Sequence, residues 1–188
     1  PSDVHGADGH RGGLVALSAT DGSESWRFDP EQGVPARGCG AIWGSPAASV
    51  AEDLVVVGTG NCNHDESWTR YSEAIVGLTL SGGEPLWSFQ PHEKGNRNDW
   101  DFAGAPNLYE IDGRPVAGLG NKDGSYYVVD RTDGELVWAA EAQRQTGTGD
   151  GFAFGGFIGA LALVEGVLVG GTAVGDCPCQ HAFDAGDG

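Results

Sequence analysis

One short pattern of residues occurs three times along this chain, and it restricts the possible folds more than any other feature. Each copy is a strand of small and apolar residues, a polar turn that contains glycine, and a tryptophan four residues after that glycine. The tryptophans are Trp26, Trp87 and Trp138, which lie 61 and 51 residues apart. A fourth copy begins at Ala182 and reaches Gly188, the last residue of the sequence. Repeats of about 50 residues built from strands and glycine turns are typical of β-propeller blades.

The segments between these turns are short and apolar, and clusters of Gly, Pro, Asn or Asp bound them. The predicted strands cover residues 13–17, 25–28, 54–58, 74–80, 85–89, 116–119, 125–129, 136–139 and 159–170. No segment shows a sustained helical period, so we expect an all-β chain with almost no helix. We expect three nearly complete four-stranded blades and part of a fourth, all within a single propeller domain that includes residues 1–188.

The tryptophan of each repeat is expected to pack between neighbouring blades. A buried indole removes about 200 Å² from water, and its N–H group then needs an acceptor, which we expect to be a backbone carbonyl. An isolated half-ring would leave a sheet edge and a blade face uncovered. We therefore expect this chain to be an arc of a larger ring and a piece of a longer protein.

The charge of the chain excludes several classes of partner. The sequence has 10 Lys and Arg residues against 27 Asp and Glu, a formal net charge of −17 at pH 7, and no basic cluster. Nucleic acids and anionic membranes attract proteins through positive charge, so we expect neither as a partner. No run of 18 apolar residues is present, so we expect no membrane span.

The four cysteines do not match a zinc site. Cys39, Cys62, Cys177 and Cys179 lack the paired CxxC spacing of zinc ligands. Cys177 and Cys179 flank a single proline, which is more typical of a loop disulfide or of unpaired thiols than of a metal site. An oxidising compartment is compatible with these cysteines, and their pairing stays open.

Four short segments carry residues that a purely structural propeller does not need. Trp43 lies among small residues, where a flat ligand can approach its ring. Asn61 follows a predicted strand, Asp99 and Asp101 supply two carboxylates, and Lys122 supplies a cation at a turn. Loops at the strand ends of a propeller gather near its axis, so we expect these residues to converge. Together they suit an anionic aromatic cofactor held with a hard cation such as Ca²⁺ or Mg²⁺.

Each of these residues also has a purely structural explanation. Trp43 could be one more packing indole, and Asn61 could be a turn residue in the left-handed conformation. Asp99 and Asp101 could form local Asx turns. Lys122 could be an exposed hairpin residue. The five histidines show no ligand spacing, and we expect all of them on surface loops.

The order and spacing of five motifs carry a family resemblance. They are Arg11-Gly12-Gly13-Leu14-Val15-Ala16-Leu17, Ile42-Trp43-Gly44, Gly58-Thr59-Gly60-Asn61, Asp99-Trp100-Asp101-Phe102 and Lys122-Asp123-Gly124. From Arg11 to Trp138 the chain resembles the dehydrogenases that depend on pyrroloquinoline quinone (PQQ), which include methanol, ethanol and polyvinyl-alcohol dehydrogenases. The resemblance implies an eight-bladed propeller, of which this chain would form about three and a half blades.

The resemblance also implies a role for each candidate residue. The tryptophan that matches Trp43 stacks under the quinone, and the asparagine that matches Asn61 binds the calcium ion of the cofactor. The aspartate that matches Asp101 is the general base beside this metal ion and counts as its second protein ligand here. The basic residue that matches Lys122 hydrogen-bonds the quinone oxygens. The implied reaction is oxidation of an alcohol to an aldehyde or ketone, with Ca²⁺ as Lewis acid and a carboxylate as proton acceptor.

Further expectations follow from the same resemblance. It implies a periplasmic or extracellular enzyme with a small or polymeric alcohol as substrate and an electron acceptor such as a cytochrome c. Two positions depart from the family pattern. Ala7 stands where methanol dehydrogenases have a calcium-binding Glu, and Asp8 would replace that Glu only after a shift of one residue. Ala103 stands where lanthanide-using members have a second Asp.

A different class of function is also compatible with the repeats. A propeller of this type without a cofactor could act as a protein-interaction scaffold, as in outer-membrane assembly lipoproteins. Such a scaffold needs the repeated tryptophans and turns, but it has no use for Trp43, Asn61, Asp101 and Lys122 together. The sequence therefore favours the enzyme.

Overall fold

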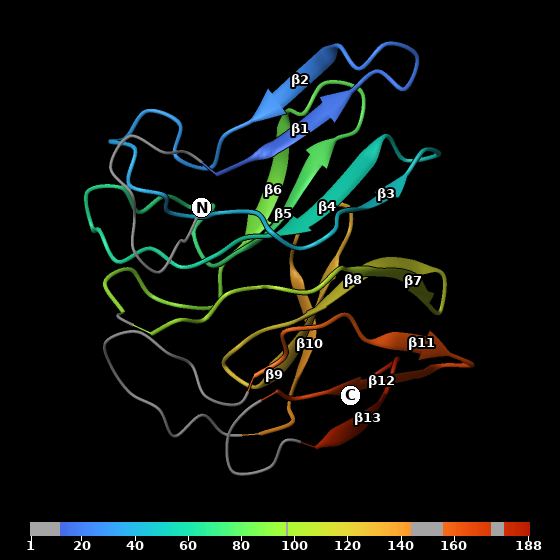
Figure 1. Cartoon of the computed structure of the whole chain (residues 1–188). Helices are drawn as coiled ribbons and strands as arrows, with labels where there is room; N and C mark the ends of the chain where they lie inside the picture. The colour runs from blue at the N-terminus through green and yellow to red at the C-terminus, as the bar shows by residue number, and fades with distance from the viewer. Residues whose placement is uncertain (1–11, 97, 144–155, 174–178) are drawn as a thin grey trace.

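The computed structural model describes residues 12–96, 98–143, 156–173 and 179–188 (Figure 1). In these ranges the regular elements are thirteen β-strands in four sheets, which agrees with the all-β prediction. Every sheet is a meander in which consecutive strands pair antiparallel. Within the described ranges, no apolar helix reaches the length that a membrane span requires.

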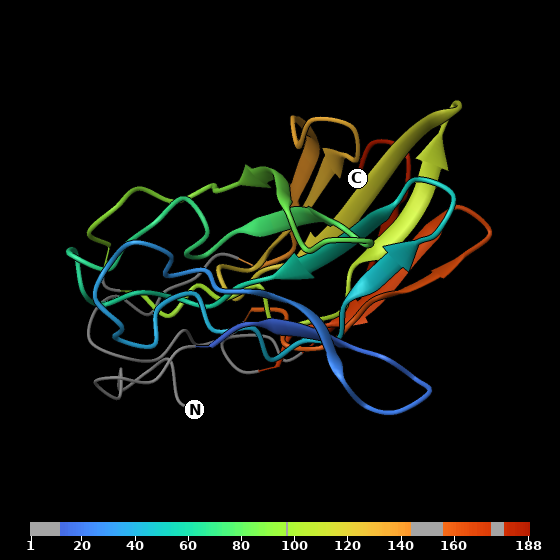
Figure 2. The same cartoon turned by 90° about the horizontal axis from the view of Figure 1, so that it is seen from above.

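The strands are assigned to the sheets in chain order. The first sheet holds β1 (Leu14–Leu17) and β2 (Glu24–Phe28), and the second holds β3 (Ala47–Ser49), β4 (Leu54–Gly58), β5 (Ile75–Thr79) and β6 (Pro85–Phe89). The third sheet holds β7 (Asn107–Ile111), β8 (Arg114–Gly120), β9 (Ser125–Asp130) and β10 (Leu136–Glu141). The fourth sheet holds β11 (Ala162–Val164), β12 (Val167–Gly171) and β13 (Gln180–Asp184). The sheets follow one another along an arc, as propeller blades do (Figure 1). Seen from above, the long loops lie on one side of the sheets and the short hairpin turns on the other (Figure 2). We call the side with the long loops the loop face.

The sheets agree with the predicted number of blades. Among the described residues, two sheets have four strands, whereas the first has two and the last has three. Three nearly complete four-stranded blades and part of a fourth were expected, and sheets of four, four, three and two strands agree with this prediction. The repeated unit covers only the last two strands of a blade, since Trp87 lies on β6 and Trp138 on β10. Counting tryptophans therefore counts outer hairpins and not whole blades.

Most predicted strands agree with the structure, and the misses have simple causes. The strands over 54–58 and 85–89 match β4 and β6. The single strand predicted over 159–170 is wrong, because a turn at Glu165 and Gly166 separates β11 from β12. β3 and β7 have no predicted counterpart, since β3 is only three small residues long and β7 begins directly after Pro106.

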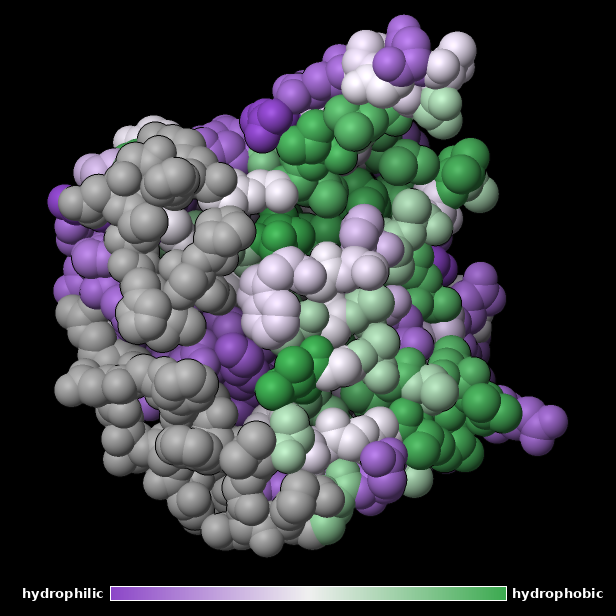
Figure 3. All heavy atoms as spheres, in the orientation of Figure 1, coloured by the Kyte–Doolittle hydropathy of each residue, from purple (hydrophilic) through white to green (hydrophobic). Residues whose placement is uncertain are grey.

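Apolar clusters between neighbouring sheets form the core. Every residue of β4 is buried. Leu54 and Val56 belong to the cluster shared with the third sheet, whereas Val55 and Val57 belong to the cluster shared with the first. Alternate side chains of a strand point to opposite faces, so a strand between two blades needs apolar residues at every position. Apolar residues accordingly gather over the sheets on the side seen in Figure 3.

The tryptophans of the first two repeats pack between blades as predicted. The indole N–H of Trp26 donates to the carbonyl of Leu80 at 2.9 Å, and that of Trp87 donates to the carbonyl of Arg131 at 2.8 Å. In both cases the acceptor belongs to the outer hairpin of the next blade. Each repeat therefore binds the repeat that follows it.

A glycine makes room for each of these rings. A Cβ atom on Gly83 would come within 2.4 Å of the Trp26 ring, and one on Gly134 within 2.8 Å of the Trp87 ring. Both glycines also have positive φ angles, of 71° and 78°. The glycine of the repeat is thus needed twice, for the turn and for the indole of the preceding blade.

Trp138 departs from this pattern. Its indole N–H is buried without an acceptor. The carbonyl that corresponds by position belongs to Ala185, and it accepts instead from the hydroxyl of Tyr109 at 3.0 Å. The expectation of a backbone partner is therefore wrong for this tryptophan.

The contact between Gly83 and Trp26 can be tested against a matched glycine. In the full-length protein, Gly83→Ala should lower the free energy of unfolding by about 2–5 kcal/mol, from the left-handed conformation and from overpacking. Gly113→Ala should cost only about 1–2 kcal/mol, because Gly113 has a φ of 82° but no atom within 4 Å of an added Cβ. Denaturant titration measures both values, and equal losses would contradict a role of Gly83 in joining the blades.

Candidate active site

The candidate residues lie in four segments on the loop face. Residues 38–46 precede β3, residues 59–62 follow β4, residues 99–104 precede β7, and residues 121–124 join β8 to β9. Backbone hydrogen bonds tie these segments to one another: Gly60 N donates to Ala41 O at 2.9 Å, Phe102 N to Thr59 O at 3.1 Å, and Lys122 N to Asp101 O at 3.0 Å. We call this series of contacts the backbone belt. It brings residues from two complete blades into one place.

Glycine permits the close approach of the first segment to the third. A Cβ atom on Gly44 would lie 2.6 Å from the carbonyl oxygens of both Ala103 and Gly104. The residue after Trp43 therefore packs directly on the backbone that follows Asp101. This contact requires a residue without a side chain.

Asp101 is at the centre of the site and is completely buried. Its Oδ1 accepts a hydrogen bond from the backbone N–H of Asn61 at 2.6 Å, and its Oδ2 accepts one from the ammonium group of Lys122. The same ammonium nitrogen lies 3.0 and 3.1 Å from the two carboxylate oxygens of Asp99. Lys122 thus bridges both carboxylates of the Asp-Trp-Asp motif.

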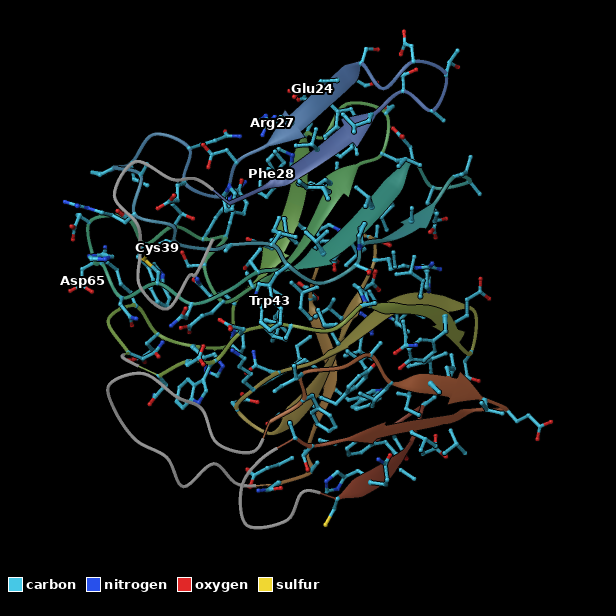
Figure 4. All side chains as sticks on the ribbon, in the orientation of Figure 1. Glu24, Arg27, Phe28, Cys39, Trp43 and Asp65 are labelled. Carbon is cyan, nitrogen blue, oxygen red and sulfur yellow. A yellow bond between two sulfur atoms is a disulfide. The ribbon has the colours of Figure 1, made fainter. Side chains whose placement is uncertain are left out.

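The ammonium group of Lys122 also reaches the aromatic candidate. Burial alone would lower the pKa of Lys122, but the charges and hydrogen bonds of Asp101 and Asp99 outweigh it and raise that pKa, so the group stays charged. Its nitrogen lies 5.1 Å from the ring centroid of Trp43, within the range of a cation–π contact. Trp43, labelled in Figure 4, is 49% exposed, so its indole is accessible to a planar ligand.

The side-chain oxygen of Asn61 is the clearest sign of a ligand. Asn61 is 1% exposed, and its Oδ1 is buried with no hydrogen-bond partner among the described residues. An unsatisfied buried acceptor costs about 1–3 kcal/mol. A hard divalent cation prefers amide and carboxylate oxygens, and the Asp101 carboxylate is bound to the same residue's N–H. The residues present therefore fit an oxygen-seeking cation.

The structural alternatives do not describe these residues. Trp43 is half-exposed, whereas the packing indole of Trp87 is 5% exposed. Asn61 is not among the described non-glycine residues with positive φ. The Asp101 carboxylate binds distant segments instead of its own turn, and Lys122 is only 9% exposed. The expected convergence is met, and the roles of these residues toward a cofactor or a metal ion stay predictions.

Glu73 belongs to this region, and the sequence analysis missed it. It is completely buried, and its backbone N–H donates to Gly60 O at 2.8 Å. Its Oε2 accepts from the side-chain amide of Asn96 at 2.9 Å, while its Oε1 is buried without a partner. One signal was available: Glu73 directly precedes a predicted strand, and Asn61 follows the strand that pairs with it. When two strands pair antiparallel, the end of one lies beside the start of the other, so residues after the first strand and before the second lie on the same side of the sheet.

Burial raises the pKa of Glu73 to about 8, although the hydrogen bond from Asn96 acts against this shift. The negative charges of Asp101, Asp99 and Asp123 add to the increase. Glu73 therefore feels the charges of three aspartates, two of which are paired with Lys122. With a pKa of about 8, Glu73 holds a proton near neutral pH.

The expectation of surface loops for all histidines is wrong for two of them. The side chain of His92 is 10% exposed, and its Nε2 lies 3.2 Å from Oδ2 of Asp123. Its ring packs against that of Trp100, with the centroids 4.3 Å apart and the planes tilted by 39°. His181 lies on β13 and stacks on Phe183. His5 and His10 lie outside the described residues. Asp123 directly follows Lys122, so His92 lies next to the candidate site.

The structure also pairs two cysteines whose partners the sequence left open. Cys39 and Cys62 form a disulfide, and both are buried. Cys39 comes from the segment of Trp43, and Cys62 directly follows Asn61. The departures at Ala7 and Asp8, and the cysteine at position 177, lie outside the described residues.

The comparison with known families decides the relationship. Residues 2–149 match the family model described as PQQ, the glucose/ethanol/alcohol dehydrogenase β-propeller domain. The chain belongs to this PQQ propeller family. The match confirms the resemblance drawn from the five motifs and the propeller architecture.

Two curated relatives of the PQQ propeller family cover much of this chain. The quinohemoprotein alcohol dehydrogenase ADH IIB of Pseudomonas putida is 28% identical in an alignment of 178 positions that covers 73% of this chain and 25% of that protein. A polyvinylalcohol dehydrogenase of a Pseudomonas species is 27% identical in an alignment of 208 positions, gaps included, that covers 95% of this chain and 32% of that protein. The chain thus spans about a quarter to a third of the length of these relatives.

A solved structure supports the same fold. BamB from Moraxella catarrhalis superposes with a TM-score of 0.58 at 21% identity, covering 93% of this chain and 44% of that one. At this identity the likeness shows the fold alone. The assignment of this chain to the PQQ propeller family therefore rests on the sequence match, and the superposition supports the blade architecture.

The raised pKa of Glu73 predicts how the stability of the metal-free, full-length protein depends on pH. The pKa of Glu73 is about 8 when folded and near its ordinary value of 4.5 when unfolded, so the folded state holds a proton that the unfolded state has lost. Stability should therefore fall as pH rises from about 4.5 to about 8, by a few kcal/mol. Glu73→Gln should remove this fall, measured as unfolding midpoints at pH 5 and pH 8 with a chelator present.

Glu93→Gln is the matched control for this measurement, since Glu93 is exposed in the loop that also carries Asn96. It should keep the pH dependence of the wild-type protein. If the wild-type protein and the Glu73→Gln variant lose stability in parallel between pH 5 and pH 8, Glu73 is not the group that takes up the proton.

Proposed function

We propose that this chain is the part of a PQQ-dependent alcohol dehydrogenase that binds the cofactor and its cation. One observation carries the proposal: the open ring of Trp43 lies 5.1 Å from an ammonium group that is joined to Asp101, beside the unpaired buried oxygen of Asn61. An aromatic surface, a cation, a carboxylate and a free amide oxygen are thus held together by the backbone belt. The reaction would be the oxidation of an alcohol to an aldehyde or ketone.

Three residues would hold the cofactor. Trp43 would stack against the flat ring system, and its exposure leaves room for that. Lys122 would donate hydrogen bonds to the quinone oxygens, since its ammonium group already lies over the same indole. Asn61 Oδ1 would bind a Ca²⁺ ion together with Asp101. When bound, PQQ accepts the electrons of the alcohol, and Ca²⁺ acts as a Lewis acid.

Asp101 would act as the general base. Both of its oxygens accept hydrogen bonds, as those of a carboxylate do. The Asn61 N–H and the Lys122 ammonium fix the orientation of this carboxylate from two different segments. A carboxylate held in this way can take the hydroxyl proton of an alcohol placed beside it.

A scaffold without cofactor is the alternative function. The likeness to BamB shows only the fold, so it does not favour this alternative over the enzyme. An unpaired Asn61 oxygen and an open Trp43 ring bring no advantage to a scaffold, because the first costs stability. Failure of the full-length protein to bind PQQ with Ca²⁺ would favour the scaffold.

The wider setting of the enzyme is part of the proposal. We propose a complete eight-bladed ring, with residues 1–188 as part of a single propeller domain. A buried disulfide is typical of proteins in oxidising compartments, which supports a periplasmic or extracellular location. A small or polymeric alcohol would be the substrate, and a cytochrome c would be a suitable electron acceptor.

The role of Asp101 can be tested by a change that keeps its shape. In the full-length protein loaded with PQQ and Ca²⁺, Asp101→Asn should lower kcat by about 10²–10⁴, because the amide cannot accept the proton. Cofactor content, measured by absorbance, should remain. Asp133→Asn changes an exposed turn aspartate and should keep normal turnover. Normal turnover of Asp101→Asn would assign the base elsewhere, with Asp99 as the first candidate.

The metal preference can be tested at Ala103. This residue is 4% exposed, lies two positions after Asp101, and offers no side-chain oxygen to a trivalent ion. Protein reconstituted with PQQ should therefore be more active with Ca²⁺ than with La³⁺, and Ala103→Asp should shift the preference toward La³⁺. Higher activity of the unchanged protein with La³⁺ would show that another residue supplies the extra charge.

A further inference from the structure

The Cys39–Cys62 disulfide lies directly beside the proposed cofactor site. Cys39 is four residues before Trp43, and Cys62 directly follows Asn61. The two cysteines are 23 residues apart in sequence and are 2% and 1% exposed. Figure 4 shows that Cys39 and Trp43 come from the same segment of the loop face. The bond therefore joins the segment of the aromatic residue to the segment of the cation ligand.

Two backbone hydrogen bonds continue this connection toward the site. Gly40 N donates to Asn61 O at 3.3 Å, and Gly60 N donates to Ala41 O at 2.9 Å. The disulfide and these bonds form a short ladder between residues 38–46 and 59–62. Neither range is part of a strand, so the ladder replaces the sheet pairing that positions residues elsewhere in the blade.

The far end of the ladder is anchored by a buried carboxylate. Glu31 is 1% exposed, and its oxygens accept from the backbone N–H groups of Arg37, Gly38 and Cys39 at 2.8, 3.3 and 3.0 Å. Several N–H groups on one carboxylate hold a loop rigidly, because buried charge-assisted hydrogen bonds are strong. The backbone of Cys39 is therefore fixed on one side by Glu31 and on the other by the disulfide.

We propose that the Cys39–Cys62 disulfide is a positioning element of the cofactor site, which sets the place of Trp43 relative to Asn61. This inference rests on the proposed function. A planar cofactor that stacks on Trp43 while its cation binds Asn61 needs both groups at one fixed separation. With the disulfide the separation exists before binding, and without it the cofactor must order the Trp43 segment at a cost in affinity.

The experiment is a double-mutant cycle on PQQ binding in the full-length protein with Ca²⁺ present. The dissociation constant is measured by equilibrium dialysis for the unchanged protein, for Cys39→Ser with Cys62→Ser, for Trp43→Ala, and for all three changes together. Removing the disulfide should weaken binding about tenfold, or about 1.4 kcal/mol. In the Trp43→Ala background the same removal should have an effect of less than about twofold, because coupled sites are not additive.

Two controls separate positioning from general stability. Cys177→Ser with Cys179→Ser removes the other two cysteines and should leave PQQ binding unchanged. Cys39→Ala with Cys62→Val is a second, apolar replacement of the disulfide, and circular dichroism checks the fold of both pairs at the assay temperature. If neither pair folds, the bond is a folding requirement and the positioning role is refuted.

The remaining outcomes distinguish the two proposals. If the unchanged protein binds no PQQ, the proposed function fails. If it binds PQQ and the disulfide variants bind equally well, the proposed function stands and the positioning role is refuted. An equal loss of affinity with and without Trp43 would also refute it, since the disulfide would then act elsewhere.

Discussion

The arrangement of the loop face depends on strands that are buried on both sides. β4 sends Leu54 and Val56 to one neighbouring blade and Val55 and Val57 to the other. A strand in this position cannot shift by one residue without losing apolar contacts on one face and meeting a mismatch on the other. The indole of each outer strand then packs against the turn glycine of the next blade. The blades are therefore held in fixed register, and the loops that leave them start from fixed points.

The backbone belt joins the loops that leave these blades and so brings the candidate residues together. Thr59 O, Asp101 O and Ala41 O accept hydrogen bonds from neighbouring segments, so these loop carbonyls are paired within the protein. Only after this pairing do the side chains of Trp43, Asn61 and Lys122 have defined places. A residue without a side chain is needed where segments approach closely, as at Gly44.

The electrostatics of the site are unbalanced toward negative charge. One lysine bridges Asp99 and Asp101, while Glu73 lies close enough to both for their charges to raise its pKa. Burying several carboxylates together is costly unless protons or cations compensate them. Lys122 compensates part of this charge, and the proton on Glu73 compensates another part. Among the described residues, Asn61 Oδ1 and Glu73 Oε1 have no hydrogen-bond partner.

The sequence by itself determined the blade type, the positions of most strands and the family. Gly and Trp recur at fixed offsets because the turn requires the glycine and the packing of the indole between blades requires both residues. Such requirements can be recognised in a single sequence. It also singled out Trp43, Asn61, Asp101 and Lys122 from their motifs. Only the tertiary structure decided the roles of Glu73, His92 and the Cys39–Cys62 bond. Burial of a carboxylate, the contact of the His92 ring with Trp100 and a pairing across 23 residues arise when separate loop segments meet, and no local pattern gives the partners.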